Sequence, residues 1–183
     1  MSSGTAACKR KALTFSANFI TAAFIASGAL AQPVQHAQTG LAVTPPPGYA
    51  ARLDTTSTFT ARIVVTRKDD PSTLCYVDLS ALTDAAIAKA TQDQLNERMR
   101  KVDQKAAMRG NFEAQTLERM EYAGVVGAVL TGHFTKSPNL ASVLVAYYTP
   151  RGRTTVSCYC PPPSFKARQS EFMAVARAIS FPR

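Results

Sequence analysis

The region from Glu113 to Cys160 consists of strand-length segments separated only by short turns. The four segments are 113–122, 125–134, 140–149 and 153–160, and Gly, Pro or Asn stands in every turn between them. Such short turns connect neighbouring strands that run antiparallel, because a parallel pair needs a crossover of a dozen or more residues. The spacing therefore predicts an antiparallel meander, which restricts the chain to folds built around an antiparallel sheet.

A hairpin and a helix are predicted on the N-terminal side of this meander. Residues 59–66 and 73–79 alternate in polarity, and the turn between them is rich in Asp and Pro, which is typical of a β-hairpin. From Thr83 to Arg109 the apolar residues recur at steps of three or four. This period predicts one long amphipathic helix.

A second helix is predicted after the meander. Three prolines follow Cys160 and end the last strand, and Ser164 is a suitable N-cap for the apolar, helix-spaced residues that come next. The predicted order is β-β-α-β-β-β-β-α. It indicates an α+β fold, with an antiparallel sheet of about six strands and both helices packed on one face.

This order resembles the PsbP-like fold, which the photosystem II extrinsic P subunit shares with the Ran-binding Mog family and with bacterial exported proteins. The resemblance rests on Pro47-Gly48-Tyr49, on the turn and strand from Gly124 to Gly132, and on the stretch from Val156 to Phe181 that ends in Ala178-Ile179-Ser180-Phe181. It covers about residues 45–183. It implies a protein that binds or assists other proteins, and it supplies no catalytic residue.

The first 31 residues have the layout of a secretory signal peptide. Its parts are a basic cluster at 9–11, an apolar stretch from 12 to 30 and a small-x-small triplet at 29–31. Cleavage there leaves a flexible tail, 32–44, before a single domain, 45–183. A retained anchor is the alternative, but no basic stop-transfer cluster follows the apolar stretch. We therefore expect a periplasmic or secreted protein with no integral membrane span after cleavage.

Three cysteines remain after cleavage, namely Cys75, Cys158 and Cys160, in a compartment where thiols tend to form disulfides. Cys158 and Cys160 lie two apart on one strand, so their α-carbons are about 6.6–7 Å apart and a bridge between them requires the strand to buckle. Cys75 is therefore expected to pair with Cys158 or Cys160, and one inert thiol remains. The alternative is a redox or metal-binding group of three thiols.

The chain is basic, with a formal charge of +9. Three of its 21 Lys and Arg residues, and none of its 12 Asp and Glu residues, lie in the leader, so +6 remains after cleavage. A possible anion-binding surface comprises Arg98, Lys101, Lys105 and Arg109 on the long helix, with Arg151 and Arg153 in the last hairpin. Weak binding to anionic lipid headgroups, polysaccharide or an acidic protein is the functional interpretation, and a solvated surface is the simpler one. Nucleic acid is not expected, because no aromatic residue is interleaved with these charges.

The segment 140–149 has apolar residues on both of its faces. One face can therefore remain exposed when the helices cover the other, unless the tail or a second copy of the chain covers it. Of the adjacent residues Tyr147 and Tyr148, the one that points outward is expected to contact a partner.

The sequence contains no recognisable catalytic, cofactor or metal motif. His36 and His133 lack the spacing of zinc ligands, the acidic residues are scattered, and no Gly-rich phosphate loop is present. We therefore expect no cofactor and favour a non-catalytic exported module that binds another protein of the cell envelope. The alternative is a thiol-dependent redox protein or enzyme that uses Cys158 and Cys160.

Overall fold

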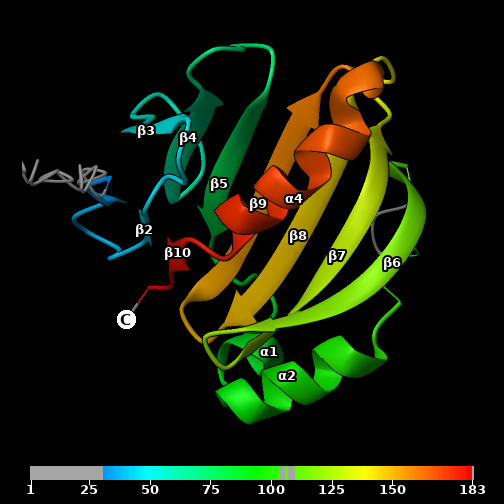
Figure 1. Ribbon diagram of the computed structural model, residues 1–183. Coiled ribbons are helices and arrows are strands. Elements are labelled where there is room, and N and C mark those ends of the chain that lie inside the picture. Colours follow the sequence, from blue (N-terminus) through cyan, green and yellow to red (C-terminus); the bar gives the residue numbers. More distant parts are fainter. Residues whose placement is uncertain (1–30, 104–105, 107–109, 183) are drawn as a thin grey trace, which may run out of the picture.

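The computed structural model describes residues 31–103, 106 and 110–182, and its main feature is a seven-stranded antiparallel sheet (Figure 1). In chain order its strands are β3 (Tyr49–Leu53), β4 (Ala61–Arg67), β5 (Leu74–Ser80), β6 (Phe112–Tyr122), β7 (Val125–Phe134), β8 (Ala141–Thr149) and β9 (Gly152–Cys160). Across the sheet the order is β3-β4-β5-β9-β8-β7-β6, so the meander joins the earlier strands through the pair β5–β9. The α+β class and the antiparallel sheet are confirmed.

The meander strands differ from the predicted segments by at most one residue at either end. The sheet has seven strands where about six were expected, because β3 was not predicted. Its sequence, Tyr-Ala-Ala-Arg-Leu, contains no β-branched residue, so it lacks the composition by which strands are usually found. β3 lies at the edge of the sheet and pairs only with β4, from Tyr49 opposite Arg67 to Leu53 opposite Ile63.

The helix expected from Thr83 to Arg109 is not continuous. The described part of this segment contains two helices, α1 (Ala85–Ala88) and α2 (Gln92–Lys101). Side-chain caps account for the break: the carboxylate of Asp84 accepts hydrogen bonds at the start of α1, and Thr91 begins α2 with a capping box. The apolar period runs through both helices and so could not reveal the interruption.

The C-terminal helix forms where it was predicted. A 3₁₀ turn, η1 (Pro162–Ser164), leads into α4 (Phe165–Ala176), which buries Phe172, Val175 and Ala176. Among the helices in the described ranges, none is both long enough and apolar enough to cross a bilayer.

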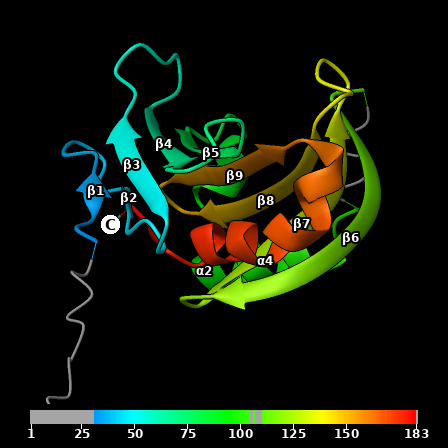
Figure 2. The ribbon, with the colours of Figure 1, turned by 45° about the horizontal axis from the view of Figure 1, so that its top comes forward.

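The helices α2 and α4 lie on opposite faces of the sheet, so the expectation that both pack on one face was wrong (Figure 2). The adjacent β7 residues Ala128 and Val129 show this arrangement. Val129 belongs to the core that Phe172 of α4 completes, whereas Ala128 packs against Met99 of α2. Neighbouring residues of a strand point to opposite faces, so a strand that is apolar at both sets of positions can bury both.

The segment before the sheet forms a small structure of its own, where a flexible tail over residues 32–44 was expected. Strands β1 (Val34–Gln35) and β2 (Ala42–Val43) pair with each other, and β2 also pairs with β10 (Ile179–Ser180) near the C-terminus. Leu41 and Val43 are fully buried in the core on the α4 side. Burial of these two side chains and the backbone pairing of β2 with β10 attach this short segment to the domain.

Candidate functional site

The cysteines were the most specific chemical prediction. Cys75 on β5 lies directly opposite Cys158 on β9, and the two form a disulfide with an S–S distance of 2.05 Å. The structure thus contains one of the two pairings that the sequence left open, and Cys160 is a free, buried thiol. Burial raises the pKa of Cys160, and the nearby positive charge of Arg168 opposes this effect more weakly. The thiolate, which is the reactive form, is therefore disfavoured.

We expect the Cys160 thiol to react slowly with iodoacetamide at pH 8 in the folded protein and rapidly after unfolding in guanidinium. The reason is that burial both blocks access and keeps the thiol protonated. Mass spectrometry of the alkylated protein measures the fraction modified over time. Rapid modification of the native protein would instead support the thiol-dependent redox or enzymatic alternative.

Within residues 31–103, 106 and 110–182, no three His, Cys, Asp or Glu side chains are grouped as metal ligands would be. His133 pairs with Glu113, the Nε2–Oε2 distance being 3.1 Å, and His36 contacts the hydroxyl of Thr39. Each histidine therefore has a local structural contact.

The two adjacent tyrosines of β8 have different environments. Tyr147 is fully buried on the α4 side, where its hydroxyl donates a hydrogen bond to the carbonyl of Ala176 at 3.1 Å, and burial raises its pKa. Tyr148 is partly exposed on the opposite face, beside α2. Tyr148 is therefore the outward-facing residue, and Tyr147 belongs to the core.

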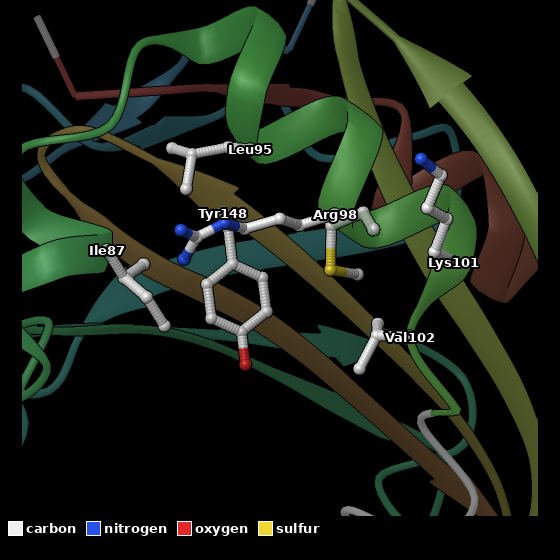
Figure 3. A pocket seen from close by; sticks show the side chains of 7 residues that line it. Ile87, Leu95, Arg98, Lys101, Val102 and Tyr148 are labelled. Atoms are coloured by element: carbon white, nitrogen blue, oxygen red, sulfur yellow. The ribbon is translucent and has the colours of Figure 1, made fainter.

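Tyr148 lies in an apolar pocket of about 410 Å³ between α1, α2 and the sheet. The pocket is lined by Ile87, Leu95, Arg98, Met99, Lys101, Val102 and Tyr148. Figure 3 shows the ring of Tyr148 between the side chains of Ile87 and Val102, with the side chain of Arg98 above it. The lining is hydrophobic apart from the two basic side chains and the tyrosine hydroxyl.

Polar contacts to the sheet hold α2 in place above this pocket. The Asn96 side chain donates to the carbonyl of Gly124 and accepts from the N–H of Val126, both at 2.8 Å. Arg119 of β6 donates to the carbonyls of Met99 and Val102 at the end of α2. These bonds fasten the middle and the C-terminal end of α2 to the sheet, so the pocket is preformed.

The basic residues of the proposed anion-binding surface do not form a single cluster. Arg98 and Lys101 line the apolar pocket, Arg153 lines a different cavity, and Arg151 is exposed in the β8–β9 turn and lines neither. Lys101 pairs with Glu97 at 2.7 Å, whereas the guanidinium of Arg98 has no ion pair with any described residue. The remaining two candidates, Lys105 and Arg109, lie outside the described residues.

The second cavity is a groove of about 510 Å³ on the same face of the sheet, on the other side of Tyr148. Strand β9 contributes Arg153, Thr155, Ser157 and Tyr159, and further walls come from the residues Phe59, Arg62, Asp78, Asn111, Phe134, Thr135, Lys136, Leu144 and Ala146. Arg62 donates to both carboxylate oxygens of Asp78, at 2.6 and 2.9 Å. The groove is therefore mixed in polarity, unlike the apolar pocket.

Most of the groove was missed in the sequence because its residues come from six separate segments. One signal was available in part: the sequence predicted a hairpin from 59–66 and 73–79, and in the observed register, which is shifted by one residue from a pairing of the predicted ends, Arg62 lies opposite Asp78. Opposite charges at facing positions of a hairpin predict such an ion pair. From the sequence alone, Asp78 was only one of the scattered acidic residues.

The arrangement of the strands and helices matches a known structure. The solution structure of cyanobacterial PsbP (CyanoP) from Synechocystis sp. PCC 6803 is similar over 85% of this chain and 95% of that chain, with a TM-score of 0.53 and 14% sequence identity. The chain has a PsbP-like fold. This fold confirms the resemblance found in the sequence, and at 14% identity it transfers no function. No protein-family model and no curated protein matches the sequence.

Proposed function

We propose that this PsbP-like protein is an exported, non-catalytic accessory module that binds another protein of the cell envelope. The observation that carries the proposal is the open apolar pocket of about 410 Å³ around Tyr148. Preformed apolar pockets with a few polar groups at the rim are typical binding sites. The PsbP-like fold is compatible with an accessory role without demonstrating one, and the Cys75–Cys158 disulfide supports an oxidising compartment. Export itself rests on the leader at residues 1–31, of which 1–30 lie outside the described residues.

The charge at the rim indicates the chemistry of the partner. Arg98 has no acidic partner among the described residues, and a formal charge of +6 remains on the chain after cleavage of the leader. A partner that inserts an apolar side chain into the pocket and places a carboxylate near Arg98 would satisfy both features. We therefore propose that the partner presents a short acidic segment containing a large apolar residue.

A photo-crosslinking experiment in the native host tests this proposal. p-Benzoylphenylalanine is placed at Val102, which lines the pocket and is 36% exposed, and in a control at Leu53, which is 37% exposed on the edge strand β3. We expect a protein adduct from Val102 and none of the same mass from Leu53. Mass spectrometry should place the crosslink in an acidic, apolar segment of the partner.

A charge reversal completes the test. Arg98→Glu in the Val102 crosslinking background should reduce the adduct at least tenfold, a loss of about 1.4 kcal/mol in binding, because it repels the partner's carboxylate. Arg151→Glu makes the same charge change on the exposed β8–β9 turn and should leave the adduct within about twofold. An adduct unaffected by Arg98→Glu, or one formed with a second copy of this chain, would contradict the proposal.

A further inference from the structure

We infer that the groove floored by β9 is a second binding site, for a small organic anion that carries a carboxylate or phosphate on a planar, apolar body. This inference goes beyond the proposed function, because the groove is distinct from the pocket lined by Arg98 and Val102. Its volume, about 510 Å³, lies within the range of small-molecule sites.

The floor of the groove is a rigid strand whose groove-lining side chains all point the same way. Arg153, Thr155, Ser157 and Tyr159 are alternate residues of β9, so their side chains all point to the α2 face. β9 is hydrogen-bonded to β5 on one side and β8 on the other over most of its length. A guanidinium, two hydroxyl groups and a phenol are thus fixed in a row by backbone pairing on both sides.

Arg62 contributes a positive charge to the wall of the groove, but this charge is already paired with the carboxylate of Asp78. Its guanidinium donates to both oxygens of Asp78 and lies 4.5 Å from the ring centre of Phe59 and 4.6 Å from that of Tyr76. These contacts hold the ion pair rigidly. They also neutralise Asp78, so this carboxylate does not compensate any other cation in the groove.

Arg153 is the cation that remains available. It forms no ion pair with a described residue, and its Nε is buried without a hydrogen-bond partner. A buried donor without a partner is destabilising, because it has lost its hydrogen bonds to water and gained none in return. An anion bound to the guanidinium would supply the missing negative charge, and Lys136 on the β7–β8 loop adds a second positive charge to the lining.

The aromatic side chains favour a ligand with a planar body. Phe134 and Tyr159 lie with ring centres 5.3 Å apart and planes inclined by 36°, and Tyr148 lies directly opposite Arg153 on the neighbouring strand. Burial raises the pKa of Tyr159, so its hydroxyl stays protonated and can donate a hydrogen bond. Rings beside a cation provide both stacking surface and charge for such an anion.

Titration of the purified, isotope-labelled protein with four probes tests this inference by NMR. The probes are benzoate, phenyl phosphate, the neutral analogue benzamide, and inorganic phosphate. We expect benzoate or phenyl phosphate to shift the Nε–Hε resonance of Arg153 and the amide resonances of Thr155 and Tyr159. The tighter of these two probes identifies the anionic group. Benzamide and inorganic phosphate should each bind at least tenfold more weakly, since one lacks the charge and the other lacks the ring.

Matched substitutions provide the control. Arg153→Gln should weaken binding of the better probe at least tenfold, and Lys136→Gln should weaken it severalfold, whereas Arg151→Gln, which removes the same charge from the exposed turn, should change it less than twofold. The Lys136 variant keeps the test valid if Arg153→Gln does not fold. Equal binding of benzamide and benzoate, equal losses in the Arg151 and Arg153 variants, or no shift at millimolar probe would overturn the inference.

Discussion

Reduction of the Cys75–Cys158 disulfide is expected to lower the free energy of unfolding by about 4.5 kcal/mol in the chain-entropy model for a loop of this length. The bridge closes a separation of 83 residues and joins β5 to β9, the pair through which the two parts of the sheet meet. Without it, the unfolded chain gains conformational freedom. Urea unfolding with and without dithiothreitol, followed by circular dichroism, measures the difference.

Two variants distinguish the contribution of the disulfide to stability from the contribution of side-chain packing around it. Cys75→Ala combined with Cys158→Ala should reproduce the effect of reduction and should abolish any further response to dithiothreitol. Cys160→Ala also removes a buried sulfur but no bridge, so it should cost about 1 kcal/mol and should leave the response to dithiothreitol intact. Equal stability of the oxidised and reduced protein would show that β5 and β9 pair without help from the bridge.

Tyr147→Ala is expected to destabilise the protein by about 3–5 kcal/mol, the range for removing a large aromatic side chain from a core. Tyr147 is fully buried, its ring packs edge-on against Phe181 with centres 5.1 Å apart, and its hydroxyl bonds to Ala176. Gly127 on β7 lies opposite, and a Cβ at that position would be 2.7 Å from the Tyr147 ring, so the core is built closely around it.

The neighbouring residue supplies the comparison for this prediction. Tyr148→Ala should cost less than about 1 kcal/mol, because the side chain is partly exposed at the rim of the apolar pocket. Tyr147→Phe should cost about 1 kcal/mol through loss of the hydroxyl alone. Thermal unfolding of the three variants provides the measurement, and equal losses for Tyr147→Ala and Tyr148→Ala would contradict the assignment of the two faces.

The meander was predictable because its signals are local. Strand-length apolar segments alternate with turns that contain Gly, Pro or Asn, and such turns allow only antiparallel neighbours. The break between α1 and α2 was harder to predict, since Asp84 and Thr91 act as caps only if the chain leaves the helical conformation beside them. β3 was missed because its neighbour β4, and not its own composition, makes it a strand.

The face to which each helix packs is a tertiary property and could not be predicted. Both faces of β8 are apolar, with Val143 and Val145 on one and Leu144 and Ala146 on the other, so the pattern does not distinguish covered from exposed. For the same reason the sequence indicated that one of Tyr147 and Tyr148 points outward but did not indicate which. The disulfide was predictable to within two residues because strand geometry excludes a bridge between Cys158 and Cys160.

The junction between β5 and β9 also determines the order in which the molecule can assemble. β3, β4 and β5 can form a ribbon early during synthesis, but the partner of β5 begins only at Gly152, after the rest of the meander has been made. Until then β5 is an unprotected edge, which is prone to pair with other chains. Contacts so distant in sequence also slow folding. Aggregation through the β5 edge is therefore a hazard during this interval, and pairing of β9 with β5 removes that edge.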